Sequence, residues 1–332
     1  MTTTAFRATA LALAATMLAA TVPAGAQEPI VLRTGAFAPP GSVYIPAWQK
    51  FKDNVEQGSK GTIKVDLNTN DPNEGNLMSN MRRGRIECVG ASLQGTSTIL
   101  PEVAVLQLPY LFTSFAQVDQ AYDKGLTDVY RKLFAAKGVA LLQFVEVGFT
   151  HMYGVAPIKA PADIKGVKLR ATQSRASQTF IKGIGAEPVV LPIAEAMPGL
   201  QTGLIKGGES GLIVYEALIS KAAPHYTLTS HAFDSGTIMC NKEWLDKLNP
   251  EQRNAVMNAY PARELALAAR AQTDKFLREA AARGVTVYRP TPDELKLWQA
   301  AGKVAADQLV GGLGADGVKI RDDIVKSIAG VK

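Results

Sequence analysis

Arg170 is the side chain of this sequence best placed to bind a charged ligand. It stands near the end of residues 167–171, where apolar and polar residues alternate as in a β-strand. Ser174 follows as a candidate N-cap for a helix running to Gly183. Ligands bind at the carboxyl ends of strands in open α/β sheets, and a guanidinium there can hold a carboxylate through two hydrogen bonds. Arg170 is therefore a candidate anion-binding residue, although strand position alone favours a surface or interdomain salt bridge.

Motifs that would indicate an enzyme are incomplete in this chain. Residues 208–211, Gly-Glu-Ser-Gly, are one residue short of the Gly-x-Ser-x-Gly turn of hydrolases, and no strand-turn-helix pattern surrounds them. The three histidines lack the spacing of a helical zinc pair, and there is no Cys-x-x-Cys. No sequence feature brings Glu195 and Glu209 together as an acid–base pair. We expect no catalytic residue, no metal site and no cofactor, and a secreted hydrolase remains a less favoured alternative.

The N-terminus has the pattern of a secretory signal peptide. Arg7 is followed by an Ala/Leu-rich run to about Val22 and then by Ala24-Gly25-Ala26, which predicts cleavage after Ala26. An N-terminal membrane anchor is the alternative, but the apolar run is short for a membrane span. We expect the mature protein to be exported and soluble.

Length and charge limit the remaining possibilities. About 305 residues follow the signal peptide, which is enough for two domains. Without Arg7 there are 35 basic and 30 acidic residues, a net charge of +5, and only Arg82, Arg83 and Arg85 cluster. This dispersed charge argues against nucleic-acid binding. Cys88 and Cys240 are the only cysteines, and the sequence leaves open whether they form a disulfide or remain buried thiols.

Periodicity and capping signals predict alternating strands and helices. Strands at 30–34, 62–67 and 88–91, with helices between them, predict a parallel α/β sheet. A further strand is expected at 139–145. A helical pattern extends over 249–283, long enough to lie across two domains, and Pro261 predicts a kink or break near Tyr260. Residues 311–317 contain Gly-x-Gly-x-x-Gly without a βαβ unit, and we expect a loop there.

The motifs around Arg170 resemble the signature of TRAP (tripartite ATP-independent periplasmic) transporter solute-binding proteins of the DctP family. In that family a Lys-Gly-Leu-Lys-x-Arg strand precedes a Gln-Ser helix start, a Gly-Ala-x-Pro turn, a Leu-Gln-x-Gly helix and an Asp-Gly-x-Glu-Asn-Pro-Leu stretch. The matching segments here are 165–170, 173–174, 185–188, 200–203 and 207–212. Residues 101–112 resemble a second family block, Pro-Glu-Leu-x-Val-Leu-Asp-Leu-Pro-Phe-Leu-Phe.

The resemblance implies a fold and a function. It implies an α/β, two-domain periplasmic solute-binding fold with hinge-crossing strands near 145–149 and 235–240 and a long domain-spanning helix. We place domain I at 27–147 plus 236–275 and domain II at 148–235 plus 276–332. Such a protein would be a periplasmic monomer that closes on a small organic acid and delivers it to the TRAP membrane permease subunits. A receptor that presents its ligand to a sensor kinase is the alternative.

The resemblance also implies a binding site, with Arg170 clamping a carboxylate. Many members with acidic ligands have a second arginine where Thr150 stands, and an asparagine where Ser210 stands. These departures favour a monocarboxylate or a less polar acid, whose apolar or aromatic body Phe149 and Tyr153 would suit. The expected ligand-binding residues are Arg170, Ser210, Thr150, Phe149, Gln173, Glu74, Ser92, Gln94, Phe37 and Tyr215.

Overall fold

A mixed β-sheet forms the centre of the protein. The computed structural model describes residues 28–331, so the predicted signal peptide lies outside the described residues. The strands are β1 Ile30–Gly35, β2 Ile63–Asn68, β3 Cys88–Ser92, β4 Val139–Gly154, β5 Lys168–Ala171, β6 Glu187–Val190, β7 Gly207–Gly211, β8 His225–Asn241 and β9 Thr286–Tyr288. Their order in the sheet is β2-β1-β3-β8-β4-β7-β5-β6, and β9 pairs with β8.

The strand directions agree only in part with the predicted parallel sheet. β1 is parallel to β2 and to β3, as expected for the first half of the chain, and β5 is parallel to β6 and β7. The middle of the sheet is antiparallel, because β8 pairs antiparallel with both β3 and β4, and β4 with β7. The first three strands therefore confirm the parallel prediction, whereas the whole sheet is mixed.

Two long strands connect the halves of the sheet. The strand expected at 139–145 continues to Gly154, so that β4 has 16 residues and its partner β8 has 17. At about 3.3 Å per residue, such a strand spans roughly 50 Å, more than one small domain. The pairing shifts register at Glu146/Gly148, where Gly148 has φ of 105°, a conformation that favours glycine. This bulge lies in the segment predicted to act as a hinge.

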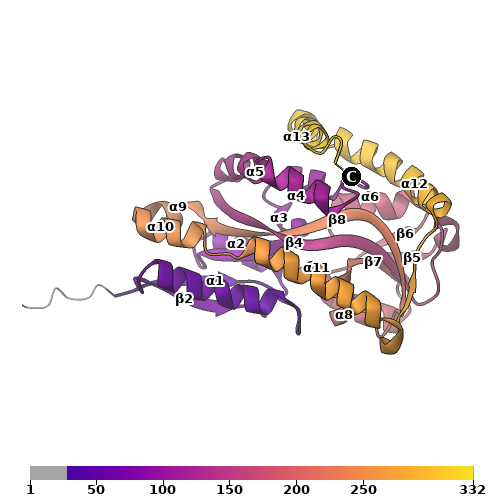
Figure 1. Cartoon of the computed structure of the whole chain (residues 1–332), viewed down its shortest axis with the longest axis horizontal. Coiled ribbons are helices and arrows are strands. Elements are labelled where there is room, and N and C mark those ends of the chain that lie inside the picture. The colour runs from indigo at the N-terminus through magenta and orange to yellow at the C-terminus, as the bar shows by residue number, and fades with distance from the viewer. Residues whose placement is uncertain (1–27, 332) are drawn as a thin grey trace, which may run out of the picture.

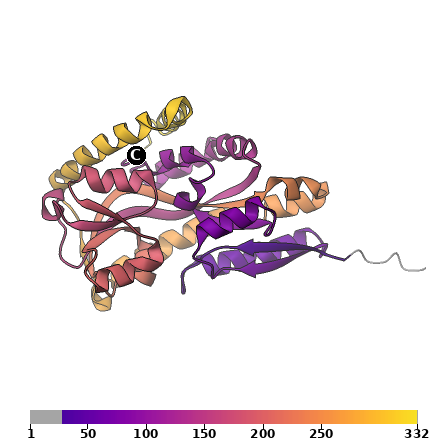
Figure 2. The ribbon, with the colours of Figure 1, turned by 180° about the vertical axis from the view of Figure 1, so that it is seen from behind.

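The helices pack on both sides of these long strands. In Figures 1 and 2, α4, α5, α12 and α13 lie on one side, and α8 and α11 lie on the other. The bounds are α1 Tyr44–Gly58, α2 Glu74–Arg82, α3 Leu93–Thr96, α4 Phe115–Asp123, α5 Leu126–Ala135, α6 Arg175–Gly183, α7 Ala196–Gln201, α8 Leu212–Leu218, α9 Lys242–Lys247, α10 Pro250–Met257, α11 Ala262–Glu279, α12 Pro292–Gly311 and α13 Gly314–Ser327, with a 3₁₀ helix at Pro101–Gln107. Among residues 28–331, no helix combines the length and hydropathy that a membrane span requires.

The helical pattern over 249–283 is divided as Pro261 predicted. α10 begins with the expected capping box, in which Asn249 and Gln252 bond to each other's backbone. It ends at Met257, and α11 begins after Pro261, because proline cannot continue the i→i−4 ladder. α11 runs along the long strands (Figure 1).

The prediction of a loop over residues 311–317 is wrong in extent. Only Gly312 and Leu313 separate α12 from α13, which starts at Gly314. Burial of Ile320 and Ile324 in the core stabilises α13 despite its glycines, because tertiary packing outweighs local propensity.

Cys88 and Cys240 form a disulfide, which answers the question that the sequence left open. The two residues lie directly opposite each other in the β3–β8 ladder. The bond joins positions 152 residues apart and ties the first strands to the end of a long connecting strand.

Candidate ligand-binding site

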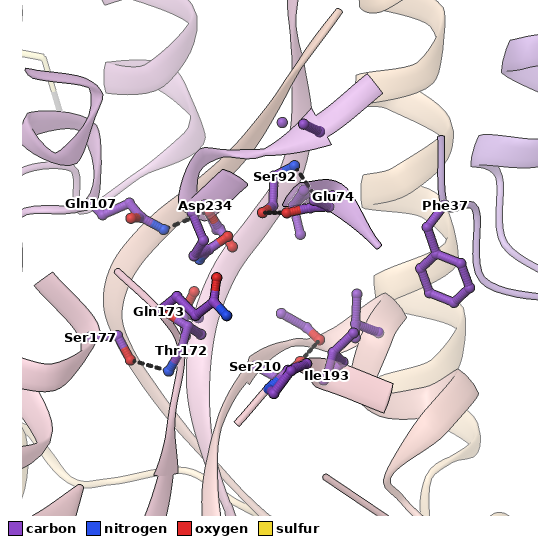
Figure 3. A pocket seen from close by; sticks show the side chains of 18 of the residues that line it. Phe37, Glu74, Ser92, Gln107, Thr172, Gln173, Ser177, Ile193, Ser210 and Asp234 are labelled. Carbon is purple, nitrogen blue, oxygen red and sulfur yellow. Dashed lines mark hydrogen bonds between the residues drawn. The ribbon is translucent and has the colours of Figure 1, made fainter. Parts of the chain in front are cut away.

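A cavity of about 640 Å³ lies where the ends of β1, β3, β5 and β7 meet the long strands β4 and β8. This volume is in the usual range for small-molecule sites. Most of the residues predicted from the sequence lie on its wall, several of them visible in Figure 3. They are Phe37, Glu74, Ser92, Gln94, Thr150, Arg170, Gln173 and Ser210.

Arg170 lies on the cavity wall at the end of β5, with only 5% of its surface exposed. Its Nε donates to the carbonyl of Leu191 at 3.0 Å, which fixes the guanidinium in one orientation. Gly208 of β7 permits this placement, because a Cβ there would lie 2.9 Å from the Cβ of Arg170 and 2.6 Å from the Tyr153 hydroxyl. Among the described residues, Arg170 forms no salt bridge. Its charge is therefore available to a ligand.

Glu209 and His231 form a buried pair on the same wall. His231 Nε2 lies 2.8 Å from Glu209 Oε2, and His231 Nδ1 lies 2.8 Å from the Thr229 hydroxyl. The imidazole also stacks on Phe180, with 4.0 Å between ring centroids. Burial disfavours the charge of Glu209, but hydrogen bonds from His231 and Ser177 and the nearby positive charges outweigh it, so the pKa of Glu209 lies below its usual value. His231 is thus a fully bonded histidine of the wall.

Glu74, the first residue of α2, and Ser92, the last residue of β3, are in direct contact. Ser92 donates to the Glu74 carboxylate from its backbone N–H at 2.7 Å and from its hydroxyl at 2.6 Å. Figure 3 shows both contacts at the edge of the cavity. The same hydroxyl accepts from Gly95 N–H at 3.2 Å and caps α3. These predicted residues therefore form one rigid corner of the site.

Asp234 and Gln107 are wall residues that the sequence analysis missed. Gln107 donates from Nε2 to Asp234 Oδ1 at 2.8 Å, and its Oε1 accepts from the Ser174 hydroxyl at 2.8 Å (Figure 3 shows the first contact). Burial raises the pKa of Asp234 to about 6, and hydrogen bonds from Gln107, Ser235 and Gln94 only partly offset that effect. A polar side chain within an apolar run, as at Gln107 in 101–112 and Asp234 in 231–240, is the signal that could have found both residues.

Thr150 and Ser210, where the resemblance implied an arginine and an asparagine in many relatives, both line the cavity. Each exposes 8% of its surface. The Ser210 hydroxyl donates to the Gly211 carbonyl at 3.0 Å, and within residues 28–331 it forms no hydrogen bond with a histidine side chain. This contact is unlike the serine–histidine hydrogen bond of an activated nucleophile. The geometry suits a neutral wall of small polar groups.

Phe149 and Tyr215 do not lie on this cavity, contrary to expectation. Phe149 packs edge-on against Phe115 and Phe233, because the β4 bulge turns it toward the helices on the other side of the sheet. Tyr215 is fully buried in α8, where its ring stacks on Tyr226 and its hydroxyl donates to the Ala223 carbonyl at 2.8 Å. The Tyr215 ring thus packs in the core, and the half-buried Phe149 ring lines a different cavity, next to Arg270.

The acid–base and metal alternatives can be compared with the observed geometry. Glu195 and Glu209 both line the cavity, but Glu209 is bonded to His231 and Glu195 is exposed. Within residues 28–331, no group of three or more His, Cys, Asp or Glu side chains is arranged to hold a metal ion. The arrangement of the wall suits binding of a small charged molecule.

Comparisons with known proteins show which family the chain resembles. The model of the bacterial extracellular solute-binding protein family 7, DctP, matches residues 34–310. The 2,3-diketo-L-gulonate-binding periplasmic protein YiaO of Escherichia coli (strain K12) is 29% identical over 64% of this chain and 66% of its own length. The ectoine-binding periplasmic protein TeaA of Halomonas elongata is 29% identical over 64% of each chain, so these alignments span just under two thirds of the relatives.

A solved structure shows the same fold. The sugar acid binding protein DctPAm of Advenella mimigardefordensis, in complex with galactonate, superposes with a TM-score of 0.84 at 24% identity. The match covers 90% of this chain and 99% of that protein. The α/β, two-domain periplasmic binding fold expected from the sequence is therefore confirmed.

Proposed function

The chain belongs to bacterial extracellular solute-binding protein family 7, the DctP family, and on this premise we propose that it is the substrate-capturing subunit of a TRAP transporter. We infer that it binds a small organic acid in the periplasm and hands it unchanged to the membrane permease. The family and the fold are those of transport proteins rather than of enzymes. Cleavage after Ala26 and action as a monomer are parts of the same proposal.

Arg170 is the observation that carries the proposal. Its guanidinium lies on the wall of the 640 Å³ cavity, held by the Leu191 carbonyl, and within residues 28–331 it forms no salt bridge with a carboxylate. An almost fully buried, unpaired cation is costly, and a ligand carboxylate would relieve that cost through two parallel hydrogen bonds. The other predicted wall residues would then contact the remainder of the ligand.

A single carboxylate is the ligand feature that we favour. YiaO and TeaA bind 2,3-diketo-L-gulonate and ectoine, and DctPAm binds galactonate, so membership of the family does not choose a ligand. Thr150 and Ser210 offer no positive charge to a second carboxylate. We therefore propose a monocarboxylate in preference to a dicarboxylate.

Calorimetry on Arg170→Ala tests the carboxylate clamp. Wild type is first screened by thermal shift against monocarboxylic and dicarboxylic acids, since a ligand of the folded state raises its apparent stability. For an acid that binds, Arg170→Ala should weaken affinity by about two decades or more, because removing one partner of a buried charge pair costs roughly 3–5 kcal/mol.

The matched control is Arg85→Ala, which removes the same charge from an exposed loop. Its affinity should equal that of wild type. Equal affinity of the Arg170→Ala variant and wild type would show that Arg170 is not the clamp. Thermal shifts with dicarboxylates alone would contradict the single-carboxylate proposal.

A further inference from the structure

The cavity wall carries more negative than positive charge. Its acidic residues are Glu74, Glu195, Glu209 and Asp234, and its basic ones are Arg170 and His231. Among the described residues, no lysine lines this cavity. A ligand that brought only negative charge would be attracted at Arg170 but repelled by the rest of the wall.

The acidic residues differ in how their charge is balanced. Glu209 is paired with His231, and Glu195 is exposed to water. Glu74 has both carboxylate oxygens occupied by the backbone and hydroxyl of Ser92. Asp234 is the remaining one, and it forms no salt bridge within the described residues.

The partners of Asp234 are neutral and occupy mainly one of its oxygens. Oδ1 accepts from Gln107 Nε2 at 2.8 Å and from the Ser235 N–H at 3.0 Å. A hydrogen bond from the Gln94 amide also stabilises the carboxylate, whereas the negative charge of Glu209 repels it. Gln107 is itself fixed by the Ser174 hydroxyl at the start of α6. The carboxylate is therefore held through Oδ1 on the wall of the cavity, which Asp234 lines.

We propose that the ligand is a zwitterion, whose carboxylate binds Arg170 and whose cationic nitrogen, an ammonium or amidinium, binds Asp234. The inference rests on the proposed function and specifies its ligand class. When the two domains close and exclude water, an ionised Asp234 needs a cation, just as Arg170 needs an anion. A zwitterion supplies both and adds no net charge to the wall. Burial raises the pKa of Asp234, and a cationic group beside the carboxylate would offset that cost.

Matched ligands test this pairing directly. The probes are ω-amino acids from glycine to ε-aminocaproate, together with betaine, and for each length the ω-hydroxy acid, the alkyl acid and the diacid. Calorimetry at neutral pH should find at least one amino acid that binds about tenfold or more tightly than its three matched acids. Asp234→Asn should remove this preference, weakening the amino acid about tenfold or more and leaving the alkyl acid unchanged or tighter.

The control variant is Asp316→Asn, which removes one exposed carboxylate from α13 outside the cavity and should keep the wild-type preference. Tighter binding of hydroxy or alkyl acids that still depends on Arg170 would overturn the zwitterion while leaving the carboxylate clamp intact. An amino-acid preference that survives Asp234→Asn would also overturn the proposal, since the cation would then bind elsewhere. Binding that is insensitive to Arg170→Ala would instead refute the proposed function, and no binding by any probe would overturn both.

Discussion

At the scale of one residue, the buried carboxylate of Asp234 lowers the stability of the folded protein. Its pKa rises from 3.8 to about 6 on folding, because burial disfavours the carboxylate. Between these values the folded state holds a proton that the unfolded chain has lost, so stability falls as pH rises from about 4 to about 6. The full shift corresponds to about 3 kcal/mol, and water in the open cavity reduces this figure.

We predict that Asp234→Asn stabilises the ligand-free protein at neutral pH. The amide has no charge to desolvate and can still accept from Gln107, so the variant should gain about 1–3 kcal/mol over wild type. Urea unfolding measured from about pH 4 to about pH 7 should show the difference growing up to pH 6 and then staying constant. Asp316→Asn should show no such pH-dependent gain. A pH-independent difference would mean that the Asp234 carboxylate is not desolvated.

Residue roles could be predicted from the sequence where a motif fixes them. Arg170 was identified from its strand and its motif, and it lies on the cavity wall. A local pattern could indicate Asp234 and Gln107 singly but not their pairing, because their contact joins positions 127 residues apart. Tyr215 and Phe149 were misplaced for the related reason that the direction of a side chain on α8 or beside a bulge depends on tertiary packing.

At the scale of elements, the Cys88–Cys240 disulfide fastens β3 to β8. We predict that Cys88→Ala/Cys240→Ala lowers the free energy of unfolding by about 2–5 kcal/mol, since the bond closes a long loop in the unfolded chain. Urea unfolding under oxidising conditions measures the loss. Ligand affinity should persist, because the β3–β8 ladder continues to Ser92 and Gly236 at the cavity.

Reduced wild type is the control for the disulfide prediction. It should be as unstable as the double alanine variant, and a reductant should leave that variant unchanged. An oxidised wild type no more stable than the variant would show that the cross-link does not constrain the unfolded chain.

Elements with strong local signals could be read from the sequence, and elements set by long-range pairing could not. The break before α11 follows from Pro261, and the α6 N-cap follows from Ser174. The length of β4 could not be predicted from the sequence, because the strand passes through a bulge at Gly148 that interrupts the alternation of apolar and polar residues. The start of α13 was hidden by glycines whose low helix propensity the core overrides.

At the scale of the whole molecule, an ion network joins the predicted hinge to helices on both sides of the sheet. Arg270 of α11 contacts Glu146 of β4 and Asp119 of α4, each at 2.7 Å from Nη2. Its guanidinium also lies over the Phe115 ring, 4.3 Å from the centroid. Burial raises the pKa of Glu146, and the hydrogen bonds and charge of Arg270 only partly offset it. The network does not line the ligand cavity, so its influence on binding must act through the position of β4.

Arg270→Met therefore tests whether domain closure depends on this anchor. The variant leaves Glu146 and Asp119 close together without their shared cation, so we expect a loss of about 2–4 kcal/mol in unfolding free energy. We also expect the variant to bind the ligand several-fold more weakly, although Arg270 does not touch the ligand cavity. Small-angle scattering should show that a bound acid lowers the radius of gyration of wild type and lowers it less in the variant.

Arg263→Ala is the matched control, because Arg263 also contacts Asp119 but is 65% exposed and should contribute less than about 1 kcal/mol. If both variants closed on the ligand as wild type does, the hinge would be governed by β4 and β8 alone, and the network would serve stability without influencing capture.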